Sequence, residues 1–418
     1  MSVDPLLQSI QGLAHRDGEP ERAAIAALSA LGFPARRVER WRYTRSDVFA
    51  DYATQALQSD VRGGDAAAAL AEWQKDTGLT NCAVFGGGEY LPNLSSLPAG
   101  ISIRPIDVAP MVGVLDDPAD ALVWLNTIAT QGRYQISVEG QTEETLHCVH
   151  LPLAENTMAQ TRLHIHVSEG ADVKIADHLI SASVQSQMLS LVTSINLEPN
   201  STLTHTRLQT TGDASLVFTR IDADIAAGAS CHTLTLDTGG KLVRNELNLR
   251  LNDSNAAAYL DGVYLSNDRQ HIDNHTQVDH VARDTVSREN YRGILRDRSR
   301  CVFNGKVMVH VGADGTDAAQ SNANLLLSDH AEIDTKPELE IYADDVKCAH
   351  GATVGQLDPQ SLFYLRARGI DEATATQLLT YAFCRELTAN LSDASLRHLA
   401  DRTIAAEIPD FTALELIT

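Results

Sequence analysis

An alternation of apolar and polar residues dominates the middle of the chain, from about Tyr134 to Tyr342. A period of two is typical of β-strands that bury one face. Turn signals interrupt the alternation at a nearly constant spacing of about 25 to 29 residues. These signals are Glu169-Gly170-Ala171, Glu198-Pro199-Asn200, Ala227-Gly228-Ala229 and Asn252-Asp253-Ser254. So regular a spacing predicts a solenoid.

The length of the repeat indicates how many strands form one coil. Three strands of about 5 to 6 residues and three connections of about 4 fill roughly 28 residues, whereas two such strands and their connections fill only about 19. We therefore predict a three-stranded coil, that is, a parallel β-helix. The alternative is an antiparallel sandwich or barrel, whose hairpins turn about every 8 to 12 residues.

Helical patterns flank the alternating region on both sides. Between Asp4 and about Leu79 alanine is abundant, and apolar residues recur at three- and four-residue spacing. Prolines and glycines gather at about residues 92–107, which indicates a boundary, and a short helix is expected at about residues 120–130.

An apolar stripe at helical spacing returns after Gly355. Its members are Ala375, Leu378, Leu379, Ala382, Phe383 and Leu387. We expect the open end of the solenoid or another protein to cover it. The predicted domains are an N-terminal helical domain (1–105), a β-helix core (106–347) and a C-terminal helical domain (348–418).

Composition limits the classes of function. The 418 residues are 44% hydrophobic, which predicts a folded protein, and the net charge of −22 argues against nucleic acid and anionic lipid as partners. The start, Met1-Ser2-Val3-Asp4-Pro5, has no basic segment followed by an apolar one, and no run of 18 apolar residues follows. We therefore expect a cytoplasmic protein.

The six cysteines are spread singly along the chain, with no CxxC pair. They are Cys82, Cys148, Cys231, Cys301, Cys348 and Cys384. This spacing argues against a disulfide scaffold or a self-contained zinc finger, and most of these thiols should be buried. GxxxxGK[ST], GxGxxG after a strand, GxSxG and HExxH are all absent, so we predict a chain that is not an enzyme.

Two groups of histidines could bind metal. His271, Asp273 and His275 share one face of a predicted strand, whereas His280 falls on the opposite face. They form either a metal triad or, more commonly in solenoids, one part of a stacked polar ladder. His164 and His166 make a weaker pair.

Cys348 and His350 are the stronger candidates, in the segment from Lys336 to Gly355 where strand-like sequence changes to helix-like sequence. On a strand, residues two apart face the same side about 7 Å from one another, close enough to bind one metal or cluster. The competing interpretation is a buried cysteine beside a histidine that bonds the backbone of a turn.

Several motifs together resemble the SufB/SufD family of iron-sulfur cluster assembly proteins, closely between residues 270 and 370 and loosely over the whole chain. The segments that carry the resemblance are Gln270–Thr276 with His280, Tyr291–Leu295, Val302–Lys306, Thr316–Asn322, Leu325–Ser328, Lys336–Gly355, Leu362–Ile370, Gly32–Pro34 and Glu39–Thr44. The form Cys348-Ala349-His350-Gly351 and the short chain favour the SufD branch, although Ala349 replaces the usual serine.

The resemblance implies a right-handed parallel β-helix between helical domains, acting as a non-catalytic scaffold. It further implies that the β-helix pairs with SufB, that the C-terminal helices dock the ATPase SufC, and that ATP-driven SufC dimerisation opens the SufB interface. A transient iron-sulfur cluster at that interface would use His350 and Cys348, and the isolated chain would hold no cofactor tightly. The expected partner-binding residues are Phe363, Tyr364, Arg366, Gly369 and Ile370.

Other interpretations stay open at this point. One is a β-helix enzyme acting on polysaccharide, for which an acid-rich surface is suitable but no export signal is present. Another is a purely structural partner of SufB and SufC without cluster ligands. Also open are the participation of a reduced flavin in the complex and the formation of a homodimer when SufB is missing.

Overall fold

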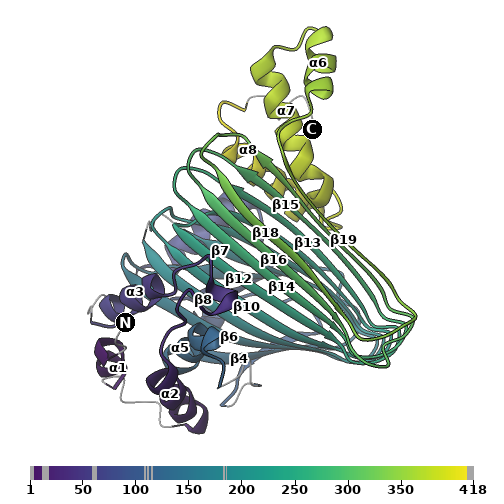
Figure 1. Ribbon diagram of the computed structural model, residues 1–418. Helices are drawn as coiled ribbons and strands as arrows, with labels where there is room; N and C mark the ends of the chain where they lie inside the picture. The colour runs from purple at the N-terminus through teal and green to yellow at the C-terminus, as the bar shows by residue number, and fades with distance from the viewer. Residues whose placement is uncertain are drawn as a thin grey trace.

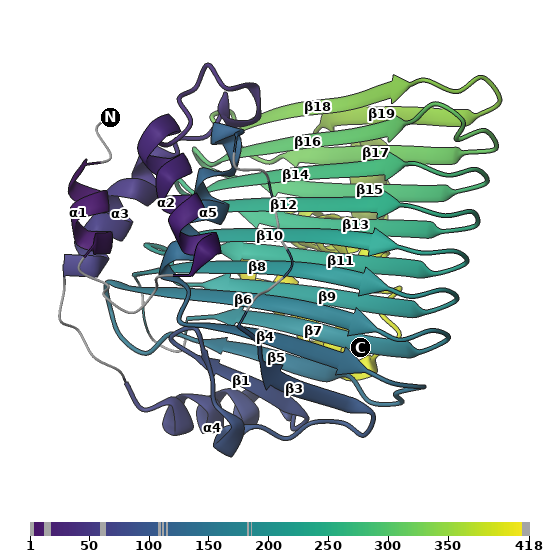
Figure 2. The same cartoon turned by 90° about the horizontal axis from the view of Figure 1, so that it is seen from below.

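The computed structural model describes residues 4–11, 18–58, 64–107, 110, 113, 116–181, 184 and 186–411. Figures 1 and 2 show a long solenoid of two β-sheets, with helices packed along its sides. Neighbouring strands within each sheet are parallel, apart from the pairs β1–β2 and β3–β4. The predicted parallel β-solenoid with helices at both ends of the chain is therefore confirmed.

Helices dominate the N-terminal part, as the apolar spacing predicted. They are α1 (Asp4–Gln11), α2 (Glu19–Leu31), η1 (Glu39–Trp41), α3 (Asp47–Gln58) and α4 (Ala66–Thr77), followed by η2 (Pro92–Leu94), η3 (Pro118–Asp120) and α5 (Ala121–Ala129). Helix α4 has standard ends, since the Asp65 carboxylate accepts from two backbone N–H groups at its start and Gly78 adopts the left-handed conformation after its end.

From β4 onward, successive strands alternate between the two sheets, so that each coil contributes one strand to each sheet. The ten-stranded sheet contains β1 (Cys82–Gly86), β2 (Glu89–Tyr90), β5 (Leu146–Leu151), β7 (Asp172–Ile180), β9 (Thr202–Thr211), β11 (Ser230–Gly239), β13 (Ala257–Ser266), β15 (Val286–Leu295), β17 (Asp317–Leu326) and β19 (Lys347–Gly355). The nine-stranded sheet contains β3 (Ile101–Pro105), β4 (Gly132–Val138), β6 (Thr157–Val167), β8 (Gln187–Leu197), β10 (Leu216–Ile225), β12 (Leu242–Leu251), β14 (His271–His280), β16 (Arg300–Val309) and β18 (Glu332–Ile341).

The prediction of three strands per coil is wrong, because each coil has two. From β9 to β18 every strand has 10 residues, and two such strands fill the repeat. The average strand length of about 5 to 6 residues is too short for these strands, because each interior strand of a solenoid is paired on both sides along its whole length.

The inward side chains of the two sheets form one continuous core that includes Leu163, Leu249, Leu260 and Phe303. The N-terminal helices and α5 cover part of the outer face of the nine-stranded sheet, where Trp124 packs in the same cluster as Phe218. Both outer and inner faces are therefore buried over much of the solenoid.

The C-terminal helices are α6 (Pro359–Ala367), α7 (Glu372–Thr388) and α8 (Ala394–Glu407). Part of the apolar stripe of α7 packs on the outer face of the ten-stranded sheet, where Leu387 is buried in one cluster with Val263 and Ile294 and Phe383 packs against that cluster. The sheet therefore covers only part of this stripe, because Leu378 and Leu379 are half-buried and Ala382 is exposed, and cover of these residues by another protein stays a prediction. The start of α7 and the whole of α6 stand clear of the sheets (Figure 1).

The last coil, formed by β18 and β19, is the least buried part of the solenoid. Strands β16 and β17 are largely buried, whereas every residue of β18 is at least partly exposed and most residues of β19 are exposed. Within the described part of the chain, each of the two strands has a paired neighbour on one side only. One end of the solenoid therefore presents two edge strands, and this is where the candidate site lies.

Candidate functional site

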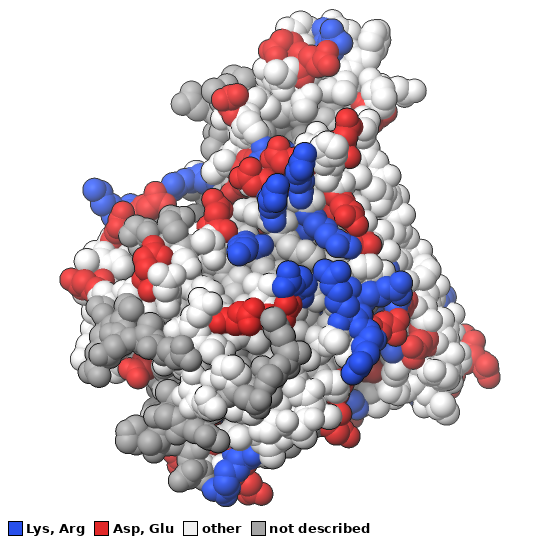
Figure 3. Space-filling view, turned by 60° about the vertical axis from the view of Figure 1, so that its left-hand side comes forward, with Lys and Arg blue, Asp and Glu red and all other residues white. Residues whose placement is uncertain are grey.

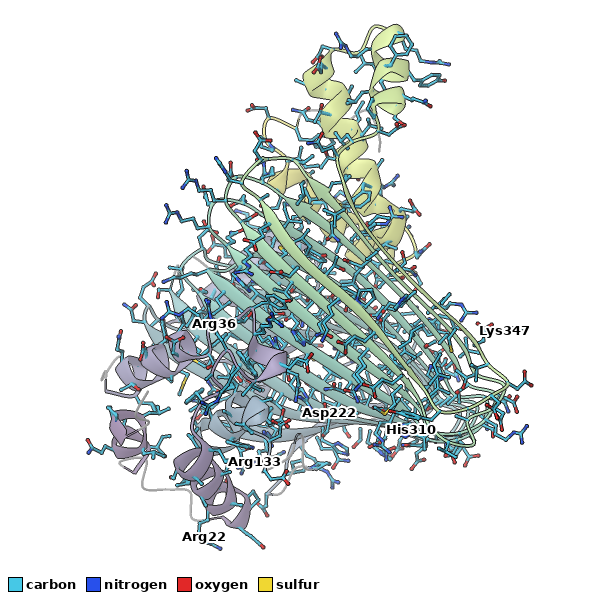
Figure 4. All side chains as sticks on the ribbon, viewed as in Figure 1. Arg22, Arg36, Arg133, Asp222, His310 and Lys347 are labelled. Atoms are coloured by element: carbon cyan, nitrogen blue, oxygen red, sulfur yellow. The ribbon has the colours of Figure 1, made fainter. Side chains whose placement is uncertain are left out.

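Strand β19 carries both Cys348 and His350. In the neighbouring strand β17 their register partners are Ala318 and Gln320, which are buried inward-facing residues. Both side chains therefore face the interior at the open end of the solenoid. Figure 4 shows Lys347, the first residue of β19, at the narrow edge of the molecule, so the strand runs from that edge toward α6.

The thiol and the imidazole differ in accessibility. Cys348 is half-buried beside an apolar cluster that includes Val307 and Ala318, whereas His350 is exposed. Burial, with a smaller contribution from Asp317, raises the pKa of the Cys348 thiol. Since thiolate is the form that binds metal, a metal ion has to displace the thiol proton of Cys348.

A layer of buried polar groups lies directly beneath β19. The Gln320 Nε2 donates to Glu289 Oε2 at 2.6 Å, and these side chains are only 4% and 2% exposed. Burial raises the pKa of Glu289 to about 7, so this carboxyl is partly protonated at neutral pH. Beside this pair, Tyr264 Oη donates to Asn324 Oδ1, and Asn322 Nδ2 donates to Tyr264 Oη at 3.1 Å.

Sequence reasoning assigned no role to Glu289 or Gln320, although Gln320 lies in one of the motifs that carry the family resemblance. A signal was present, because the alternation of β15 and β17 places both polar residues at inward positions of a core. A charged residue at such a position departs from the ordinary pattern of a half-buried strand.

His271, Asp273 and His275 lie together on the outer face of β14, and His280 lies on the inner face, as the alternation predicted. Among the residues that the structure describes, no group of three or more His, Cys, Asp or Glu side chains is arranged to hold a metal ion. Instead, Arg244 Nη1 donates to Asp273 Oδ2 at 2.6 Å, and His275 Nε2 lies 3.0 Å from Asp273 Oδ1. Burial opposes ionisation, but Arg244 and His275 together hold the pKa of Asp273 well below its ordinary value.

The N-terminal segment Glu39–Thr44 covers this group. Arg244 lies over the ring of Trp41, 4.6 Å from its centroid, and donates to the backbone oxygen of Arg40 at 3.0 Å. Thr44 donates to Asp273 Oδ2, and Arg40 Nη2 donates to Glu246 Oε2 at 3.0 Å. We call these contacts the N-terminal clamp, since they join the N-terminal helices to β12 and β14. They favour the polar-ladder interpretation of the His271–His275 motif.

His164 and His166 lie on the outer face of β6, with ring centroids 6.4 Å apart. The ring Nδ1 of His164 is 3.0 Å from Ser194 Oγ, and His166 Nε2 is 3.4 Å from Glu198 Oε1. Each histidine therefore has its own polar neighbour on the sheet surface.

The five predicted partner-binding residues lie on or just after α6. Phe363 and Tyr364 are 73% and 56% exposed, and no residue of α6 is buried. Arg366 pairs with Glu372 at 3.0 Å, and Gly369 adopts φ +88° between α6 and α7, a conformation that favours glycine. Ile370, which follows, is half-buried.

Charge is unevenly distributed in spite of the large negative total. Figure 3 shows a face where Lys and Arg side chains gather with Asp and Glu among them. On the outer face of the last coils Arg300 pairs with Asp334 at 2.6 Å, and Lys306 pairs with Glu340 at 2.8 Å. Within the described part of the chain, no helix has the length and apolarity needed to cross a membrane.

Fold and site together define a parallel β-solenoid protein with an uncapped end that carries a histidine and a cysteine. The family model described as SUF system FeS cluster assembly, SufBD core domain, matches residues 150–383. The chain therefore belongs to the SufBD family of iron-sulfur cluster assembly proteins.

Relatives support this assignment over nearly the whole chain. The iron-sulfur cluster assembly protein SufD of Escherichia coli K12 is 31% identical over 394 residues, which cover 92% of each protein. A SufBD family protein of Synechocystis is 29% identical over 429 residues, covering 94% of this chain and 93% of the relative. The chloroplastic protein ABCI7 of Arabidopsis thaliana is 25% identical over 412 residues, covering 90% of this chain and 83% of the relative.

Proposed function

We propose that this chain is a SufD-like scaffold subunit that pairs with SufB through the last coil of its solenoid. The observation that carries the proposal is the uncapped end, where no described strand pairs with the outer edges of β18 and β19 and their backbone N–H and C=O groups can pair with another chain. Such an edge binds another strand readily. Ile341, Tyr342 and Val354 are exposed apolar side chains on or beside these strands, and a partner would bury them.

A transient iron-sulfur cluster is the cargo of the proposed interface, with His350 and Cys348 as ligands from this chain. Clusters are usually held by about four protein ligands, and this pair supplies two. The remaining ligands would come from SufB or from free sulfide and thiols. A site shared between two chains suits assembly and release, because separation of the chains removes half of the ligands.

The exposed aromatic side chains of α6, Phe363 and Tyr364, fit a docking surface for the ATPase SufC. Only three residues, Gln356 to Asp358, connect β19 to α6. A movement of α6 that follows ATP binding would therefore act on the strand that carries His350.

The test is co-expression of this chain with SufB and SufC, followed by anaerobic measurement of iron and sulfide in the purified complex. We expect His350→Ala to assemble normally but to lose most of its iron and sulfide. His330→Ala is the matched control, since His330 is an exposed histidine in the turn before β18. Equal iron and sulfide in wild type and His350→Ala would refute the ligand role and favour a purely structural partner of SufB and SufC.

A further inference from the structure

The side chains beneath His350 form a column that ends at the candidate site. Glu289 in β15, Gln320 in β17 and His350 in β19 are register partners on three successive strands. Neighbouring strands are about 4.8 Å apart, so these inward side chains stack on one another. Gln320 is therefore the side chain directly below His350.

Glu289 has no cation partner among the described residues, which is unusual for a buried carboxyl. Its Oε2 accepts a hydrogen bond from the amide nitrogen of Gln320 at 2.6 Å. This bond fixes the orientation of the Gln320 carboxamide. The other end of the carboxamide, Gln320 Oε1, is a buried acceptor that has no hydrogen-bond partner in the described structure.

Gly305 in β16 makes room for this arrangement from the opposite sheet. A Cβ atom at Gly305 would lie 2.0 Å from Gln320 Nε2 and 2.9 Å from the ring of Phe303. Any other residue at this position would push the Gln320 amide away from Glu289. The two sheets thus jointly hold one carboxamide in one orientation.

We propose that Gln320 is a positioning residue for His350, held in place by Glu289 and Gly305. In the assembled site Gln320 Oε1 accepts a hydrogen bond from one ring nitrogen of His350, which directs the other ring nitrogen toward the iron of the cluster. Histidines that bind metal usually donate their second N–H to a carbonyl or carboxylate, and loss of that partner weakens metal binding about 10- to 100-fold. This inference rests on the proposed function of His350.

The test uses the same anaerobic complex with SufB and SufC. We expect Gln320→Leu and Glu289→Leu to assemble and to retain their cluster at least about 10-fold more weakly against an iron chelator. We also expect the nitrogen coupling of the histidine ligand to change in pulsed electron paramagnetic resonance of the reduced cluster. Glu289→Gln should restore retention, because the amide oxygen of glutamine still accepts from Gln320.

Asn324→Ala is the matched control, because Asn324 is an equally buried inward amide of β17 that lies in register with Val354. We expect it to keep its cluster. Equal loss in Asn324→Ala would overturn the proposal, since the role of Gln320 would then be general packing. Wild-type retention and nitrogen coupling in both leucine variants would also overturn it, provided that His350→Ala loses the cluster.

If the leucine variants do not assemble, Gly305→Ala decides the question, because it displaces the Gln320 amide and removes no polar group. Loss of retention is the expected result, and a wild-type cluster would overturn the proposal. If His350→Ala itself retained the cluster, the role of His350 as a ligand would be refuted, and the positioning role of Gln320 would be refuted with it.

Discussion

Replacing Asp273 by asparagine tests whether the His271–His275 motif is structural. Asp273 is fully buried, and its Oδ2 accepts from Arg244 at 2.6 Å and from Thr44. Asparagine keeps the shape of the side chain and removes the charge that faces the buried guanidinium of Arg244. The buried guanidinium of Arg244 would then face less negative charge within the N-terminal clamp.

The expected cost follows from the contacts that remain. Removing one partner of a buried ion pair costs about 3 to 5 kcal/mol. Arg244 keeps its second partner, since Nη2 donates to Glu246 Oε1 at 2.7 Å. We therefore expect Asp273→Asn to lower the free energy of unfolding by about 3 kcal/mol, the lower end of that range.

Denaturant unfolding followed by circular dichroism measures this cost. Asp334→Asn is the control, because it breaks a contact of similar length, 2.6 Å to Arg300, between side chains that are 25% and 32% exposed. We expect the control to cost at most about 1 kcal/mol. An Asp273→Asn cost no greater than that of the control would refute the clamp. Loss of iron from the complex with unchanged unfolding would instead favour the metal interpretation.

Two further predictions concern a buried carboxylate in β7 and the exposed helix α6. Burial opposes ionisation of Asp177, yet hydrogen bonds from His150 and His205 hold its pKa below the ordinary value. The Asp177 carboxylate therefore contributes its full stabilisation above about pH 4, and this stabilisation is lost as the pH falls further. In acid unfolding curves, Asp177→Asn should reduce the fall in the free energy of unfolding between about pH 5 and pH 2. An unchanged pH dependence of the free energy of unfolding would contradict this prediction. Phe363→Ser should change the free energy of unfolding by less than about 0.5 kcal/mol, because the side chain is exposed. The same variant should weaken capture of SufC by the tagged chain. Unchanged capture would rule out α6 as the docking surface for SufC.

The sequence predicted the solenoid because its corners recur in the chain. Three of the four turn signals contain a residue with positive φ, namely Gly170, Asn200 and Gly228, and Asn255 follows the fourth. All four mark the same corner, where the chain passes from the nine-stranded to the ten-stranded sheet. One corner per coil gives the repeat length but leaves the number of strands undetermined, and this is why the three-stranded coil was wrong.

The candidate site was only partly visible in the sequence. Alternation correctly placed Cys348 and His350 on one face of a strand, and it separated His280 from the His271–His275 motif. The stacking of Glu289, Gln320 and His350 could not be predicted, because it depends on the register between strands about 30 residues apart. The clamp joins Thr44 to Asp273, and such pairings over long sequence distances depend on tertiary packing.

The uncapped last coil also makes the free chain prone to self-association. Repeat proteins generally depend on terminal caps to remain dispersed, and Pro337 together with the charged outer side chains of β18 limits pairing on one strand only. After Lys347, strand β19 carries mostly small residues and no Lys, Arg, Asp or Glu. We therefore expect free copies of this chain to associate with one another through the edge of β19 as their concentration rises.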